Sequence, residues 1–106
     1  MKKVVFRPRA ENDLIALYNY IAVQSGNHNL AFEIMWRLRA ACISLADFPE
    51  RGVQRDDIIA GLRILIFERR NIVAYRIMAD VEILAIFGAG QDWFSLFQIH
   101  DDFENE

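Results

Sequence analysis

The most regular pattern of hydrophobic and polar positions lies in residues 61–87, where three apolar runs are separated by two short polar breaks. Alternate side chains of a β-strand point to opposite faces, so the pattern predicts strands at residues 62–67, 72–77 and 81–87. The breaks are short enough for hairpin turns, which favours antiparallel pairing. Both faces carry apolar residues, and we expect each to be at least partly covered. Strict alternation places four residues of the third run on one face: Val81, Ile83, Ala85 and Phe87.

A strand and two helices are expected before this meander. Residues 2–7 alternate as a short strand, which the following proline ends because it lacks the amide N–H of a central ladder. Apolar residues at spacings of three and four predict a helix over residues 10–23, which Gly26 and Asn27 end. The same spacing predicts a second helix over residues 29–46. Two such helices form an antiparallel hairpin that can lie across one face of the sheet.

The remaining segments predict a loop and a terminal element. Residues 50–60 are rich in charge and are expected to form a loop. Asp92 is placed as an N-cap, and helical spacing after it predicts a short C-terminal helix. The element order is therefore β-α-α-β-β-β, an α+β fold with a helical hairpin packed on a mostly antiparallel sheet. The 106 residues are expected to form one domain, with a core at residues 4–90 and a C-terminal segment, 91–106, that ends in an acidic tail.

Composition and charge restrict the class of protein. Hydrophobic residues make up 54% of the chain and charged residues 25%, as in folded proteins. Residues 1–99 hold all 12 Lys and Arg but only 11 of the 15 Asp and Glu, so the net charge of −3 comes from the tail. A protein that binds nucleic acid through its phosphates usually has a large basic excess. Direct, specific nucleic-acid binding is therefore not predicted.

No cofactor, metal or membrane association is predicted either. The single cysteine, Cys42, cannot form an internal disulfide, and with two histidines it makes no zinc cluster. The longest uncharged apolar run is far shorter than the roughly 20 residues of a membrane-spanning helix. Arg7 and Arg9 interrupt the apolar start of the chain too early for a secretory signal. We therefore expect a cytoplasmic protein.

Five segments, taken in order, carry a resemblance to a known family. They are AENDLIALYNYIA at 10–22, LADFPERG at 45–52, DDIIAGLR at 56–63, IVAYRI at 72–77 and VEILAI at 81–86. Together they resemble the RelE/ParE toxin superfamily, most closely its ParE-type plasmid stabilisation toxins. The resemblance implies the toxin of a type II toxin–antitoxin system, neutralised by a ParD-like antitoxin. It also implies a target, since members of the ParE branch with a known target act on DNA gyrase and trap its cleaved DNA complex without catalysing a reaction.

The RelE branch of the superfamily instead cuts mRNA in the ribosome, which requires a base, an acid and cations around the phosphate. The RelE branch has a pair of alternate basic residues at the positions of Arg63 and Leu65, so this chain keeps only the first of the two. A further arginine of that branch would fall near Ile72, where this chain lacks it. Many relatives read His-Gly-Arg-Arg or Gly-Lys-Arg where this chain reads FGAGQ at 87–91. These departures disfavour the usual mRNA nuclease.

Two alternatives to a gyrase inhibitor stay open at this point. One is a degenerate toxin homologue that retains only antitoxin binding. The other is a ribosome-dependent mRNA endonuclease that uses a non-standard set of arginines: Arg63, Arg69, Arg70 and Arg76.

The same four arginines are candidates for contact with the target or the antitoxin. A structural role is equally plausible for Arg63 and Arg76, which could form ion pairs across the strands. The acidic residues that could pair with them are Asp56, Asp57 and Glu82. Solvation in a hairpin turn explains Arg69 and Arg70. No catalytic residue is assigned.

Three aromatic residues complete the set of contact candidates: Trp36, Trp93 and Phe97. Trp36 lies with Phe32 and Ile43 on a second apolar face of the long helix. That face either binds a partner or is covered by the first strand or the C-terminal segment. Trp93 and Phe97 belong to the predicted terminal helix, which either docks on the sheet or marks where the antitoxin or a second copy binds.

Overall fold

The computed structural model describes residues 2–88, 91 and 92 of the chain. Strand β1 (Val4–Phe6) is followed by two long helices, α1 (Pro8–Ser25) and α2 (His28–Ile43). Two short 3-10 helices, η1 (Ser44–Ala46) and η2 (Pro49–Arg51), lead into the other strands. These are β2 (Val53–Gln54), β3 (Leu62–Phe67), β4 (Asn71–Ile77) and β5 (Val81–Phe87).

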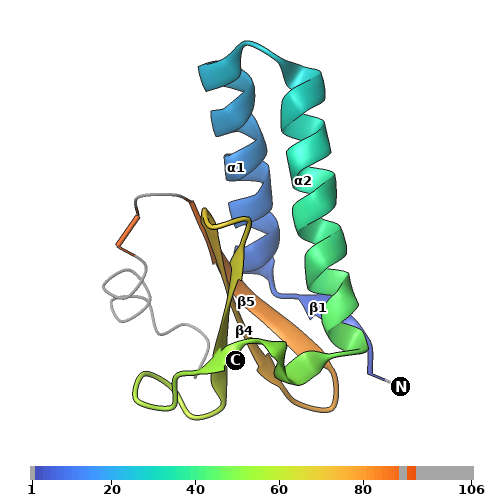
Figure 1. Cartoon of the computed structure of the whole chain (residues 1–106), viewed down its shortest axis with the longest axis vertical. Helices are drawn as coiled ribbons and strands as arrows, with labels where there is room; N and C mark the ends of the chain where they lie inside the picture. The colour runs from blue at the N-terminus through green and yellow to red at the C-terminus, as the bar shows by residue number, and fades with distance from the viewer. Residues whose placement is uncertain (1, 89–90, 93–106) are drawn as a thin grey trace.

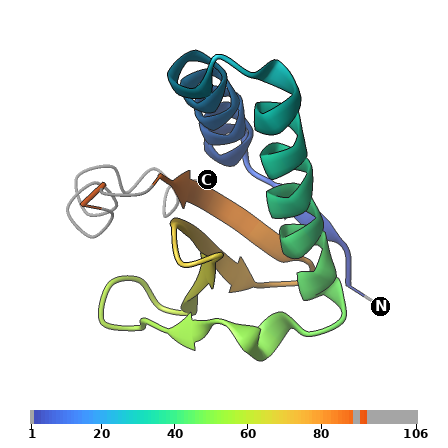
Figure 2. The same ribbon diagram turned by 45° about the horizontal axis from the view of Figure 1, so that its top comes forward.

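The strands form one sheet in the order β1-β5-β4-β3-β2. β1 pairs with β5 in parallel, and the other neighbouring strands are antiparallel. α1 and α2 form an antiparallel hairpin on one face of the sheet, where α1 packs against β5. The connected ends of the two helices project well beyond the sheet (Figure 1; Figure 2). The fold thus has two layers, with a helical overhang at one end.

The predicted α+β class and the β-α-α-β-β-β order are confirmed. One strand was not predicted: β2 lies within the segment expected to be a loop, and it pairs with β3. This strand has two residues, both exposed, so it carries no apolar alternation that could reveal it. The element bounds also differ, since α1 begins at Pro8 and α2 ends at Ile43, where η1 continues the chain to Ala46.

The break between the helices is made by two residues with different tasks. Gly26 adopts a left-handed conformation, with φ of 66°, and its N–H donates to the carbonyl of Ala22. Asn27 was expected to help end the first helix, but it begins the second. Its side chain accepts a hydrogen bond from the N–H of Leu30 at 3.0 Å, as an N-cap does.

A β-bulge in β5 changes the faces expected for that strand. Ala74 pairs with Ala85 but Tyr75 pairs with Ile83, so Leu84 is an extra residue between them. An extra residue reverses the alternation beyond it. Val81, Ile83 and Ile86 therefore belong to the core under the helices, whereas Leu84, Ala85 and Phe87 belong to the core on the opposite face. The prediction that Ala85 and Phe87 share a face with Val81 and Ile83 is wrong.

Both sheet faces are at least partly covered, as expected. The helices cover one face over Val73, Tyr75 and Ile83. On the other face, Ile58 and Ile59 from the loop before β3 pack against the second core. Neither α1 nor α2 combines the length and apolarity that a bilayer span requires.

Candidate partner-binding site

Arg63 and Arg76 lie on opposite faces of the sheet. Residues paired across antiparallel strands share a face, and Arg63 pairs with Tyr75 while Arg76 pairs with Leu62. Tyr75 belongs to the core under the helices and Leu62 to the core on the other face. The two arginines therefore cannot act on one phosphate group.

Each of these arginines is held by internal contacts. Nη1 of Arg63 donates to the carbonyl oxygens of Glu50 at 3.1 Å and Gly52 at 2.8 Å. Nε of Arg76 donates to Glu82 at 3.3 Å, which confirms the predicted cross-strand pairing for this residue.

The prediction that Arg63 pairs with Asp56 or Asp57 is wrong, because each of these carboxylates binds another residue. Asp57 accepts two hydrogen bonds from Arg55, at 3.0 and 2.9 Å. Asp56 accepts from the N–H of Gly61 at 2.8 Å. Arg63 therefore fixes the backbone of η2 and of Gly52, which follows it, instead of pairing with an acid across the strands.

Tyr75 fixes the same segment from within the core. Its side chain is fully buried, its hydroxyl donates to the carbonyl of Pro49 at 2.7 Å, and it accepts from the N–H of Gly52 at 2.8 Å. Burial raises the pKa of this hydroxyl. A Cβ on Gly52 would lie 2.6 Å from the hydroxyl oxygen, so only glycine fits there. Tyr75 is thus a structural residue and cannot act as a proton donor to a ligand.

Arg69 and Arg70 lie at the far end of β3 from Arg63, in the hairpin turn to β4. Glu68 and Arg69 have φ of 49° and 61°, so two residues of the three-residue hairpin loop at 68–70 are in the left-handed conformation. The turn is tied to α2, because Arg37 donates to both carboxylate oxygens of Glu68, at 3.1 and 3.2 Å. The four candidate arginines therefore do not converge on one site.

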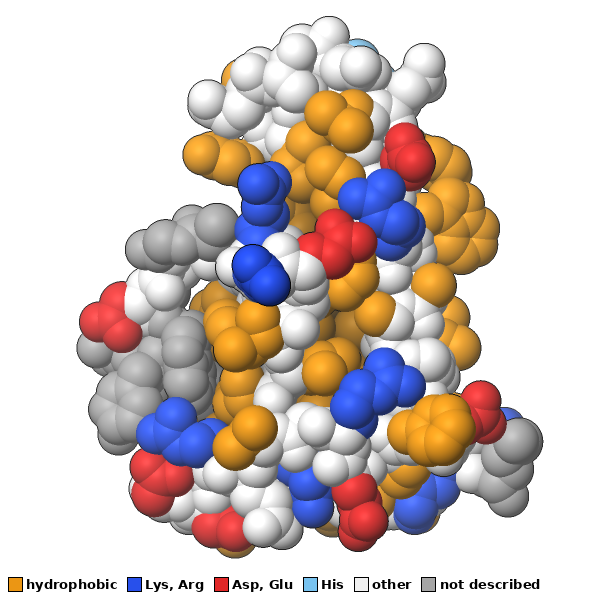
Figure 3. Space-filling model, in the orientation of Figure 1, with side chains coloured by type: hydrophobic (Ala, Val, Ile, Leu, Met, Phe, Trp, Pro, Cys, Tyr) orange, Lys and Arg blue, Asp and Glu red, His pale blue; other side chains and the backbone are white. Residues whose placement is uncertain are grey.

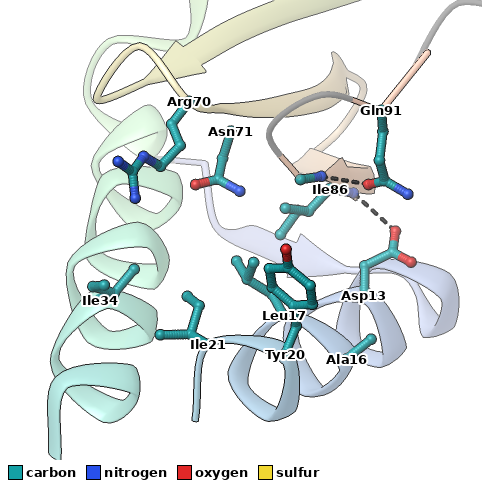
Figure 4. Close-up of a pocket in the computed structure, with 11 residues that line it drawn as sticks. Asp13, Ala16, Leu17, Tyr20, Ile21, Ile34, Arg70, Asn71, Ile86 and Gln91 are labelled. Atoms are coloured by element: carbon teal, nitrogen blue, oxygen red, sulfur yellow. Dashed lines mark hydrogen bonds between the residues drawn. The ribbon is translucent and has the colours of Figure 1, made fainter. Parts of the chain in front are cut away.

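A cavity of about 520 Å³ lies where the helical overhang meets the end of the sheet. We call it the helix–sheet pocket (Figure 4). Its walls come from α1, from Ile34 of α2, from the β3–β4 turn and from the end of β5. The lining residues are Asp13, Ala16, Leu17, Tyr20, Ile21, Ile34, Arg70, Asn71, Ile86, Gly88 and Gln91. Of the residues proposed from the sequence, only Arg70 is among them.

Most polar lining groups of the helix–sheet pocket are used to hold the elements together. Asp13 accepts from the N–H of Ile86 at 2.9 Å and lies 3.6 Å from Nε of Arg9. Burial raises the pKa of Asp13, although the hydrogen bond and Arg9 oppose the shift. The amide of Asn71 donates to the carbonyl of Phe87 at 3.3 Å, and the side-chain oxygen of Gln91 accepts from the N–H of Gly88.

Arg70 differs from these groups. It is exposed, and its side chain makes no hydrogen bond or ion pair with any residue that the structure describes, although its backbone N–H donates to the carbonyl of Phe67 at 3.0 Å. Its side chain reaches over the pocket toward α2 (Figure 4). Of the two charged lining residues, Asp13 is therefore engaged, whereas the side chain of Arg70 has no partner among the described residues. From the sequence, Arg70 was one of the four candidate contact arginines, with solvation in a hairpin turn as the alternative, but nothing in the sequence signalled the role of Asp13.

The second apolar face of α2 is exposed. Trp36, Phe32 and Ile43 have 54%, 51% and 48% of their surface accessible, so β1 does not cover them. The rings of Phe32 and Trp36 contact each other edge to face, with centroids 6.4 Å apart. Apolar side chains line the outer side of α2 (Figure 3). The predicted C-terminal helix with Trp93 and Phe97 lies outside the described residues.

The described part of the chain offers no obvious metal centre, since no group of three or more His, Cys, Asp or Glu side chains gathers there. Cys42 is fully buried, and burial raises the pKa of its thiol to about 12. A thiol in this state is a poor nucleophile and a poor metal ligand.

Comparison with known proteins places this arrangement in a family. The model of the family described as "ParE toxin of type II toxin-antitoxin system, parDE" matches residues 4–93. A solved structure described as "Chromosomal ParDE TA system from P. aeruginosa" has a similar fold, with a TM-score of 0.73. The sequences are 23% identical, and the match covers 84% of this chain and 97% of that one. Among curated proteins, none matches this chain.

Proposed function

Since this chain belongs to the ParE toxin family of type II toxin–antitoxin systems, we propose that it inhibits DNA gyrase by binding it in the cytoplasm, and that a ParD-like antitoxin neutralises it. The proposal is for a protein-binding inhibitor without catalytic chemistry of its own. The observation that carries it is the placement of Arg63 and Arg76 on opposite faces of the sheet.

Cutting RNA demands a base, an acid and cations that converge on one phosphate. In the described part of the chain, the groups of this kind on β3 and β4 are used for structure. Arg63 and Tyr75 hold η2 and Gly52, and Arg76 is paired with Glu82. Arg69 and Arg70 are separated from them by the length of β3. This distribution favours binding to a protein target over nucleolysis.

The test is expression of the chain with and without its antitoxin, followed by assays with purified gyrase. We expect growth arrest that the antitoxin reverses, loss of negative supercoiling, and accumulation of gyrase-cleaved DNA. Primer extension on translated message is the parallel assay, and we expect no new cuts. New cuts in message with intact gyrase activity would replace the proposal by the nuclease alternative.

A third result identifies the degenerate homologue. In that case growth, gyrase and message are all unaffected, while the purified chain still binds the antitoxin. The matched control for all three assays is the same chain co-expressed with antitoxin, because it contains the same protein in its neutralised form.

A further inference from the structure

We infer that the helix–sheet pocket is the anchor site for the antitoxin, and that it takes a short segment in which large apolar side chains adjoin a carboxylate. This inference rests on the proposed antitoxin partner and names the surface and the chemistry of its recognition. Neither Arg63 nor Arg76 lines this pocket.

The first step is the shape of the site. The overhang leaves Leu17, Ile21 and Ile34 facing Ile86 at the end of the sheet, and the space between them is about 520 Å³. A cavity of this size lies in the range of ligand-binding sites and exceeds what one side chain fills. The apolar walls therefore fit a segment that inserts more than one apolar side chain.

The second step is the rigidity of the walls. Asp13 joins α1 to β5 through the N–H of Ile86, and Asn71 joins β4 to β5 through the carbonyl of Phe87. Glu68 joins the turn to α2 through Arg37. Each wall is thus tied to another wall, so the pocket exists before a ligand binds, and binding costs less ordering entropy.

The third step is charge. Arg70 has no ion-pair partner in the described chain and reaches over the pocket (Figure 4). A ligand that covers it without supplying an anion leaves a desolvated charge unpaired, which is costly. An acidic residue beside the apolar side chains removes that cost. The pocket should therefore bind a segment that carries an acidic residue more tightly than a basic or purely apolar segment.

Nucleic acid does not fit these requirements, since the walls are apolar and a single arginine faces the space. Among protein partners, the antitoxin is favoured because the family is defined by two-component toxin–antitoxin systems. Gyrase and a second copy of this chain are the other occupants that the experiment must separate.

The experiment uses the full-length chain and the antitoxin encoded beside it, with affinity measured by calorimetry. Ala16→Trp fills the pocket from an exposed position of α1, and Arg70→Glu reverses the available charge. Arg69→Glu is the matched control, because it makes the same change one residue away, in the same turn, at a side chain that does not line the pocket. Circular dichroism and thermal melting check that each variant is folded.

We expect Ala16→Trp to weaken antitoxin binding by about a hundredfold or more, because it removes the space for the anchor. Arg70→Glu should weaken it by about tenfold, and this difference should shrink at high salt, which screens exposed charges. Arg69→Glu should change it by less than about threefold.

Unchanged antitoxin affinity in Ala16→Trp overturns the inference. If that variant instead abolishes self-association or gyrase binding while antitoxin affinity is retained, the pocket belongs to a second copy or to gyrase, and the inference is also overturned. Gyrase cleavage is assayed with the wild-type chain alone. A negative result in that assay rejects gyrase as the target. The antitoxin affinities of the variants test separately whether the pocket binds the antitoxin.

Discussion

Replacing Tyr75 with phenylalanine removes one hydroxyl group and leaves the aromatic ring in place. The ring is fully buried in the core under the helices, so its packing is retained. The hydroxyl makes two hydrogen bonds, one to the carbonyl of Pro49 at 2.7 Å and one from the N–H of Gly52 at 2.8 Å. The substitution therefore isolates the contribution of a single buried polar group to the segment around η2.

The magnitude follows from what is left behind. Gly52 is buried, so its N–H loses its partner without gaining water, which costs about 1–3 kcal/mol. The carbonyl of Pro49 is only part-buried and regains solvent. We expect Tyr75→Phe to lower the free energy of unfolding by about 2 kcal/mol, since no cavity is created. For a domain of this length, that corresponds to a fall in melting temperature of roughly 10 °C.

The assay is urea unfolding followed by circular dichroism, with Tyr20→Phe as the matched control. Tyr20 is 64% exposed, and no hydrogen bond of its hydroxyl is present within the described chain, so the same change there should cost less than about 0.5 kcal/mol. Equal free energies of unfolding for the two variants would refute the reasoning. So would a changed m-value, which would indicate an altered unfolded or native ensemble instead of a lost contact.

The pH dependence supplies a second check on the same variant. Burial raises the pKa of Tyr75 above its ordinary value of 10.0, so the unfolded chain loses this proton first as the pH rises. The stability contributed by the neutral hydroxyl is complete below pH 10.0 and is lost as the pH rises through the pKa in the folded state. The difference in free energy of unfolding between the wild-type chain and Tyr75→Phe should therefore become smaller above that pH.

Three further outcomes are expected. Gly52→Ala should destabilise the fold by about 1–3 kcal/mol, because its Cβ would lie 2.6 Å from the hydroxyl oxygen of Tyr75. In urea unfolding, the double variant with Tyr75→Phe should lose less free energy of unfolding than the two single variants lose together. Asp13→Asn keeps an acceptor for the N–H of Ile86. Because burial raises the pKa of Asp13 above 3.8, the stability of the wild type relative to this variant should be greatest below that pH and should fall as the pH rises. Thermal melting of both chains at several pH values measures this difference. Cys42, fully buried with a pKa of about 12, should react with a thiol reagent only in the urea-unfolded chain, and rapid labelling of the native protein would contradict this.

The elements that could be predicted from the sequence are those whose burial is periodic. Successive side chains of β3 and β4 lie on alternate faces of the sheet, and both helices carry apolar residues at spacings of three and four, so the positions of these elements were predicted to within a few residues. β2 could not be found, because a two-residue edge strand with both side chains exposed has no period. The cross-strand partner of Arg76 was predictable since register alone brings Glu82 opposite it.

The features that were missed depend on contacts between distant parts of the chain. The bulge at Leu84 has no local sign, because Leu84, Ala85 and Ile86 are all apolar and suit either face. Asp13 of α1 accepts a hydrogen bond from a backbone N–H that lies 73 residues away, at Ile86 in β5. Such a partner is set by how α1 packs on the sheet, which spacing along the helix does not encode.

The bulge and the pocket are physically linked. β1 pairs with β5 only as far as Ile83, so beyond that residue the edge of β5 next to α1 has no strand partner. An unpaired N–H at a buried edge must find an acceptor, and Asp13 supplies it at Ile86. Because the bulge turns Ile86 toward the helices, the same residue offers its N–H to α1 and its side chain to the pocket wall. The early end of β1 therefore leaves this edge of β5 without a strand partner near the overhang, and the extra residue in β5 turns Ile86, instead of Ala85 or Phe87, toward the pocket.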